Sequence, residues 1–91
     1  MIEVNAATLA SYAGTYELGA RRSVYVKYSD GTLLGSSDGL DWAELLAERE
    51  TRFFVRGEDI RIVFVRNEAG EVTELILVVE GGAKLHAPRV E

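Results

Sequence analysis

The sequence predicts an all-β fold: a small eight-stranded antiparallel up-and-down barrel with a short N-terminal helix. Turn signals recur about every ten residues, a spacing typical of short strands. The segments between the turns are rich in Val, Ile, Tyr, Phe and Thr, and the connections are too short for crossover helices, so neighbouring strands must be antiparallel. The turn signals are Gly19-Ala20-Arg21, Asp30-Gly31, Asp38-Gly39, Gly57-Glu58-Asp59, Asn67-Glu68-Ala69-Gly70 and Gly81-Gly82.

Closure of the sheet follows from the need to protect its edges. Short antiparallel strands avoid exposed edges by curling into a closed or nearly closed barrel, or by splitting into two packed sheets. We favour the barrel. Because the strands are short, side chains should fill most of the interior and leave at most a small cavity.

The elements follow in order along the chain. A helix is expected over residues 6–12, where Asn5 can cap the first turn and Leu9 and Tyr12 share one face. The segment from Leu40 to Glu48 also suits a helix by propensity, but its place in the turn rhythm favours a strand. The expected strands lie at 12–18, 22–29, 32–37, 40–47, 51–56, 60–66, 71–80 and 83–90, and the whole chain, residues 1–91, forms one domain.

Composition limits the function classes. With 91 residues, of which 47% are hydrophobic, the chain can build one small core. Fifteen acidic residues against ten basic ones give a net charge of −5, which would repel a nucleic-acid backbone. No window approaches the run of about 18 apolar residues that a membrane-spanning helix needs, so no membrane partner is expected. Cysteine is absent, which excludes disulfides and leaves the compartment open.

The stretch from Arg52 to Arg66, RFFVRGEDIRIVFVR, combines aromatic residues with four arginines. Alternation along a strand directs one set of side chains to the core and the other set outward. The arginines fall mostly on the outer side, where nearby glutamates and Asp59 can neutralise them. This pattern indicates solvated ion pairs and not a nucleic-acid surface. The expected core set is Phe53, Val55, Ile60, Ile62 and Phe64.

A second, outward-facing set is too apolar for a fully solvated exterior. It predicts an interaction patch, which would be covered by the N-terminal helix, by a second copy of the chain or by a neighbouring domain. The members of this patch are Phe54, Val63, Val65, Ile76 and Val78.

No catalytic residue is expected. Gly35-Ser36-Ser37-Asp38-Gly39 matches the G-x-S-x-G pattern of a nucleophile elbow, and His86 follows it. That elbow requires a strand, a sharp turn and a helix in a much longer α/β scaffold, whereas this stretch is typical of a hairpin turn. A single histidine and no cysteine make a metal site improbable, and no cofactor is expected.

A barrel of this kind can also hold a small apolar ligand at an open mouth. The aromatic residues expected near such a mouth are Tyr28, Trp42 and Phe53, although the same residues would also suit the core.

Several segments together resemble a known family. The motifs ASYAGTYEL, ERETRFFVRG, IRIVFVRNEAGEVTELIL and HAPRV are similar to the lipocalin-like C-terminal accessory domain, of the DUF3471 type, found behind serine beta-lactamase-type hydrolases and penicillin-binding-protein-like peptidases. The resemblance runs from about Leu9 to Val90 and is weakest from Gly35 to Ala47. It implies a non-catalytic domain that docks on a catalytic hydrolase domain, assists its assembly or shapes substrate access. The chain would then be a fragment of such a hydrolase or a stand-alone relative.

Overall fold

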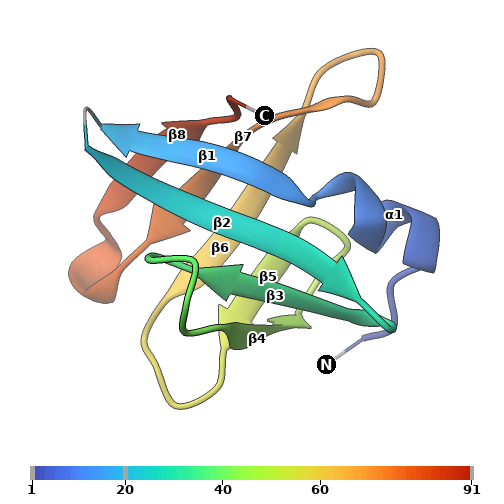
Figure 1. The fold of residues 1–91 in the computed structure, drawn as a ribbon, viewed down its shortest axis with the longest axis horizontal. Helices are drawn as coiled ribbons and strands as arrows, with labels where there is room; N and C mark the ends of the chain where they lie inside the picture. Colours follow the sequence, from blue (N-terminus) through green and yellow to red (C-terminus); the bar gives the residue numbers. More distant parts are fainter. Residues whose placement is uncertain (1, 20, 91) are drawn as a thin grey trace.

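The computed structural model describes residues 2–19 and 21–90, and within them all strands belong to one antiparallel sheet (Figure 1). Each strand pairs with the next one along the chain, in the order β1-β2-β3-β4-β5-β6-β7-β8. The predicted up-and-down order is therefore confirmed. The elements are α1 (Ala6–Ser11), β1 (Gly14–Gly19), β2 (Arg22–Ser29), β3 (Thr32–Ser36), β4 (Ala43–Ala47), β5 (Arg52–Val55), β6 (Arg61–Arg66), β7 (Val72–Val78), the 3-10 turn η1 (Glu80–Gly82) and β8 (Lys84–Pro88).

The fourth strand differs most from its predicted bounds. It begins at Ala43 and not at Leu40, because residues 40–42 belong to a hydrogen-bonded loop. The alternative of a helix over Leu40 to Glu48 is wrong. The strand ladder with β3 and β5 supplies the backbone hydrogen bonds of this segment.

The sheet closes on itself through a short seam between β1 and β8. An isolated antiparallel bridge joins Tyr16 to Arg89, and the Val90 amide donates to the Thr15 carbonyl over 2.8 Å. The Arg89 guanidinium also donates to the Ala13 carbonyl over 2.6 Å, just beyond the end of α1. These contacts make a nearly closed barrel.

Helix α1 lies across one end of the barrel (Figure 1). Its N-cap is Asn5, as predicted, and the Asn5 Oδ1 atom accepts from the amides of Ala7 at 2.8 Å and Thr8 at 3.4 Å. The helix contacts β2 and β3, and its Leu9 side chain enters the core. The helix therefore closes an end of the barrel and does not lie on the outer face of β5 to β7. No helix among the described residues is long and apolar enough to cross a bilayer.

Aromatic rings fill the α1 end of the interior. The ring centroids of Tyr12 and Phe64 are 4.1 Å apart and nearly parallel, and Phe53 meets both rings edge-on. The Tyr16 ring completes the group, with its centroid 5.9 Å from that of Phe64. All four side chains are at most 2% exposed. We call Tyr12, Tyr16, Phe53 and Phe64 the aromatic cluster.

The polar atoms of this cluster have partners. The Tyr12 hydroxyl donates to the Glu50 carbonyl over 2.7 Å and accepts from the Arg66 guanidinium at 2.6 Å. The Tyr16 hydroxyl donates to the Tyr12 carbonyl over 2.8 Å. Burial raises the pKa of Tyr16 to about 12 and also raises the pKa of Tyr12, although Arg66 opposes the shift at Tyr12. Both phenols are thus held neutral.

Among the described residues, the opposite end of the barrel carries no α-helix, only the 3-10 turn η1 between β7 and β8. The connections β1–β2, β3–β4, β5–β6 and β7–β8 gather there, at the left in Figure 1, while the other three hairpin connections lie at the α1 end. We call the end opposite to α1 the mouth.

Candidate functional site: the barrel mouth and the outer face

A pocket opens at the mouth, between the β3–β4 and β5–β6 connections. Its volume is about 360 Å³, and it reaches the inner face of the sheet. This volume falls within the range of about 300–1,000 Å³ that small-molecule sites occupy. The lining residues are Val24, Gly35, Ser36, Ser37, Asp41, Trp42, Ala43, Leu45, Val55, Glu58, Ile60, Ile62 and Leu77.

Small residues leave this space open. Gly35 and Ala43 are cross-strand partners on β3 and β4, and both line the pocket. A Cβ atom on Gly35 would lie 3.3 Å from the methyl carbons of Leu45, so a larger residue there would require the Leu45 side chain to shift by a few tenths of an ångström. Leu45 lines both this pocket and a second one, of about 320 Å³, beside the N-terminal residues Ile2 to Val4. Leu45 therefore borders both spaces.

The β3–β4 loop is held by its own side chains. The Asp38 Oδ1 atom accepts from the Leu40 amide at 2.8 Å, the Asp41 amide at 2.9 Å and the Ser36 hydroxyl at 2.9 Å. The Ser36 hydroxyl accepts in turn from the Gly39 amide at 2.8 Å. These hydrogen bonds lower the pKa of Asp38 below its usual value, and the bonds from the Asp41 and Leu40 amides contribute most. The loop is therefore preorganised around an ionised carboxylate.

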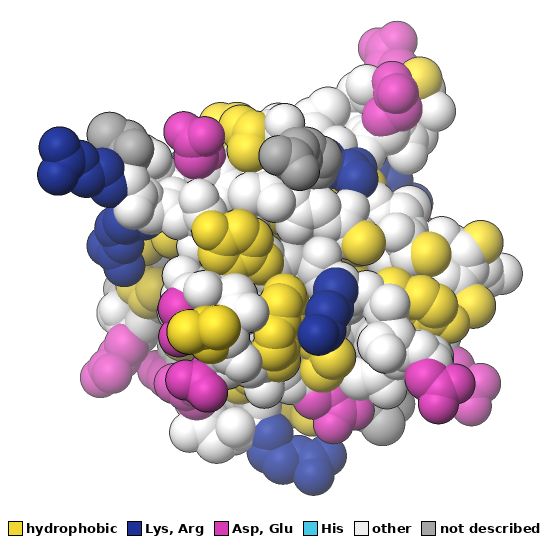
Figure 2. All heavy atoms as spheres, in the orientation of Figure 1, with side chains coloured by type: hydrophobic (Ala, Val, Ile, Leu, Met, Phe, Trp, Pro, Cys, Tyr) yellow, Lys and Arg dark blue, Asp and Glu magenta, His cyan; other side chains and the backbone are white. Residues whose placement is uncertain are grey.

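This loop carries Trp42 into the wall of the pocket. The Lys27 ammonium lies 4.1 Å from the centroid of the Trp42 ring, and Lys27 is not itself a lining residue. Leu40, at the tip of the loop, is 82% exposed. Figure 2 shows hydrophobic side chains gathered around a basic one on the face that carries β2 and β3, with acidic side chains close by.

The charged groups of the pocket have one sign. Asp41 and Glu58 line it, and no Lys, Arg or His does so. Within residues 2–19 and 21–90, neither carboxylate takes part in an ion pair. The pocket thus combines an apolar floor with an acidic rim.

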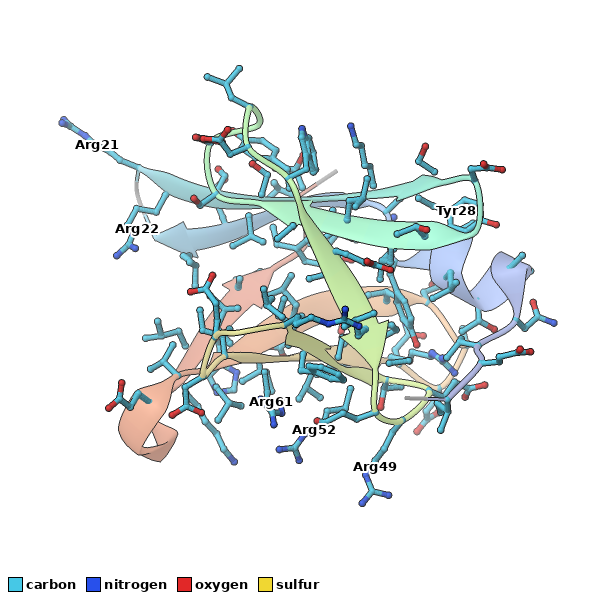
Figure 3. The ribbon with its side chains drawn as sticks, turned by 90° about the horizontal axis from the view of Figure 1, so that it is seen from below. Arg21, Arg22, Tyr28, Arg49, Arg52 and Arg61 are labelled. Carbon is cyan, nitrogen blue, oxygen red and sulfur yellow. The ribbon has the colours of Figure 1, made fainter. Side chains whose placement is uncertain are left out.

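The three aromatic residues predicted for a ligand site do not come together. Trp42 lies in the wall of the mouth pocket. Phe53 is 1% exposed and belongs to the aromatic cluster, because it is an inward residue at the α1 end of β5. Tyr28 lies near the α1 end of β2, opposite Leu33, and packs against the core. Figure 3 shows Tyr28 on the side of the barrel opposite to Arg49, Arg52 and Arg61.

Sequence reasoning missed several residues of the pocket, among them Ser36, Asp41, Glu58, Ile60 and Leu77. The order of the connections in the sequence could have predicted part of this pocket. In an up-and-down barrel, alternate connections lie at the same end, so the turns at 37–42 and 57–60 had to be neighbours.

The G-x-S-x-G stretch forms a hairpin connection, as predicted, with Gly39 at a positive φ of 77°. The Ser36 hydroxyl is engaged with Asp38, and Ser37 is exposed on the loop. His86 lies on β8, where its Nδ1 atom is 2.9 Å from the Glu74 carboxylate. No hydrogen bond joins His86 to either serine in the described part of the chain.

The predicted interaction patch lies on the outer face of β5 to β7. Cross-strand partners share a face of a sheet, and the register forms rows across the strands. One row runs Leu46, Phe54, Arg61, Val78 and Lys84. The next rows contain Arg52, Val63, Ile76 and His86, and then Val65, Glu74 and Pro88.

The apolar members of these rows are half-buried without cover from α1. Phe54, Val63, Val65, Ile76 and Val78 all keep an intermediate exposure. Leu46, opposite Phe54 in the same row, is only 5% exposed and therefore adds little to the accessible apolar surface. The prediction that these side chains point away from the core is confirmed. We call the five predicted residues the outer patch.

Basic side chains edge the outer patch. The Glu48 carboxylate bridges Arg52 at 3.2 Å and Arg61 at 2.9 Å, and the Arg61 guanidinium lies 5.5 Å from the centroid of the Phe54 ring. Figure 3 shows Arg52 and Arg61, with Arg49 beside them, pointing away from the barrel on this side. This side of the acidic molecule therefore carries a local excess of arginine.

The fold and these surfaces define a small antiparallel β-barrel with one helix-closed end, an acidic pocket at the other end and an apolar outer patch. The chain belongs to the family described as a domain of unknown function, DUF3471, whose family model matches residues 1–87. Comparison with curated proteins and with solved structures finds no match.

Proposed function

We propose that this chain is a non-catalytic interaction domain of a serine hydrolase and that the outer patch docks on the catalytic domain. The observation that carries the proposal is the uncovered apolar set Phe54, Val63, Val65, Ile76 and Val78. Contiguous apolar surface of this kind is typical of contact sites. The resemblance of the sequence motifs to accessory domains of serine hydrolases supports the choice of partner.

Charge favours such a partner over a second copy of the chain. The rows of the outer patch contain three basic residues, Arg52, Arg61 and Lys84, and the acidic Glu74. The Glu48 carboxylate bridges both arginines, so the basic groups still outnumber the acidic ones. Two copies placed face to face would bring these basic groups together, which opposes association. A surface with an apolar centre and a carboxylate rim would complement the patch.

The test is binding of the separately produced domain to the serine hydrolase catalytic domain encoded with it, measured by calorimetry. Phe54→Glu should weaken binding by at least about tenfold, because it places a carboxylate in an apolar contact. Leu40→Glu is the matched control, since Leu40 is 82% exposed on another face, and it should leave binding unchanged. Equal binding by all three proteins would refute docking through this patch. Self-association of the chain that Phe54→Glu abolishes would assign the patch to a second copy instead.

We propose as a second candidate function that the domain binds a small apolar ligand at the mouth. The observation in its favour is the pocket of about 360 Å³ with Trp42 in its wall. A titration with 1-octanol should change Trp42 emission, and Ala43→Phe, which fills the pocket, should abolish that change. An emission that stays constant up to saturating octanol would refute this second function.

A further inference from the structure

We infer that the mouth pocket selects small amphiphiles that carry a positive charge, with the alkyl part inside and an ammonium group at the rim. This inference rests on the second proposed function and specifies its ligand class. The argument combines the apolar depth of the pocket, the sign of its charged groups and the position of its single tryptophan.

The apolar depth comes from inward residues of several strands. Val24, Leu45, Val55, Ile62 and Leu77 line the pocket, and all belong to strands. Each methylene group that a ligand buries against such a surface contributes about 0.8 kcal/mol. The pocket therefore favours an alkyl segment, and polar ligands without one gain little from it.

The rim supplies the charge selectivity. Asp41 comes from the β3–β4 loop and Glu58 from the β5–β6 connection, so the two carboxylates stand on the two loops that border the opening. Neither takes part in an ion pair within residues 2–19 and 21–90. A ligand anion would meet both negative charges, whereas an ammonium group would be attracted to both.

Trp42 adds a further preference for cations. Indole is the aromatic side chain that attracts ammonium groups most strongly. The Lys27 ammonium already covers one face of this ring, at 4.1 Å from the centroid, so a ligand cation would have to use the remaining face of the indole and the two carboxylates. Asp38 accepts from the Asp41 amide over 2.9 Å and so fixes the loop that carries both Asp41 and Trp42, and both residues line the pocket.

The experiment compares three octyl probes by Trp42 fluorescence, each below its micelle-forming concentration at low ionic strength. We expect octyltrimethylammonium to bind most tightly, 1-octanol next and octanoate least. Asp41→Asn and Glu58→Gln should each weaken the ammonium probe about threefold, and together about tenfold, while octanol binding stays unchanged. Added salt should reduce the advantage of the ammonium probe.

Glu68→Gln is the matched control, because Glu68 is an exposed glutamate of the β6–β7 turn at the other end of the barrel. It changes the net charge as Glu58→Gln does and should leave all three affinities unchanged. Equal affinity for octanol and the ammonium probe, or tightest binding of octanoate, would overturn the inference and leave the apolar ligand function intact. Absence of binding by all three probes would overturn both.

Discussion

The two ends of this barrel are built from the same strands and differ in what fills them. At the α1 end, the aromatic cluster occupies the interior, and Tyr12 is tied to Glu50 and Arg66 by hydrogen bonds of 2.7 and 2.6 Å. At the mouth, Gly35 and Ala43 stand where larger side chains could have met, and a pocket of about 360 Å³ remains.

The difference shows how a small barrel can combine a stable core with an open site. Close packing at one end secures the fold, so the other end can leave apolar side chains half-covered. Ile60 and Leu77 at the mouth are only partly buried. Leu75, which lies two residues before Leu77 on the same strand, is fully buried. Stability and ligand access should therefore respond to mutations at different ends.

The largest contrast is expected between two leucines of β7. Leu75 and Leu77 face inward on the same strand, but Leu75 is 0% exposed and Leu77 lines the mouth pocket. Leu75→Ala should lower the free energy of unfolding by about 3–5 kcal/mol, because it leaves a closed cavity. Leu77→Ala should cost about 1–2 kcal/mol, since solvent can fill the space. Urea denaturation measures both, and equal losses would contradict the proposed difference between the ends.

A smaller effect is expected from the buried hydroxyl at the α1 end. Tyr12→Phe removes the donor to the Glu50 carbonyl and the acceptor of the Arg66 guanidinium, so it should cost about 1–3 kcal/mol of unfolding free energy. Tyr28→Phe is the control, because the Tyr28 hydroxyl makes no hydrogen bond within the described residues and its loss should cost under about 0.5 kcal/mol. Indistinguishable denaturation curves for the two variants would exclude a structural role for the Tyr12 network.

The α1 end should also be the part that alkali destabilises. Burial raises the pKa of Tyr16 to about 12, whereas an unfolded tyrosine titrates near 10. The unfolded chain therefore releases this proton first, and the stability conferred by neutral Tyr16 is complete below about pH 10 and declines as the pH rises toward 12. Urea midpoints measured from pH 8 upward should fall in this window, and the fall should be smaller in Tyr16→Phe. A midpoint that does not depend on pH there would contradict the assignment.

The smallest effect on global stability is expected at the mouth loop. Asp38→Ala removes the acceptor of the Leu40 and Asp41 amides, so hydrogen exchange of these two amides should accelerate while the core amides stay protected. Acid should act in the same direction, because the pKa of Asp38 is lowered in the fold and the contribution of its carboxylate is lost as the pH falls through that value. Unchanged exchange in Asp38→Ala would show that other contacts fix the loop.

Much of the fold could be predicted from the sequence, because turn residues and period-two alternation act locally. Phe53, Ile62 and Phe64 were assigned to the core in this way and are at most 4% exposed. The family model also matches the family that the motifs resembled. The strand β4 begins three residues later than predicted, because the amides of residues 40 and 41 donate to the Asp38 carboxylate. Side-chain periodicity does not reveal such hydrogen bonds.

The candidate site was less predictable, because it depends on which strand ends meet. Tyr28 stands at the end of β2, and Trp42 stands just before the start of β4. In an up-and-down barrel these positions lie at opposite ends, so the grouping of Tyr28, Trp42 and Phe53 required a register and direction that alternation alone does not fix. The acidic rim required knowledge of which loops are neighbours.

The seam between β1 and β8 has a consequence for how the molecule forms. Every other strand pair joins consecutive strands through a short connection, so those pairs close small loops at low entropic cost. The contact of Arg89 with Ala13 spans 76 residues and must wait for the hairpins to be in place. Pairing of β1 with β8 should therefore be the last step of folding. The seam should also be the first part of the sheet to open in local unfolding.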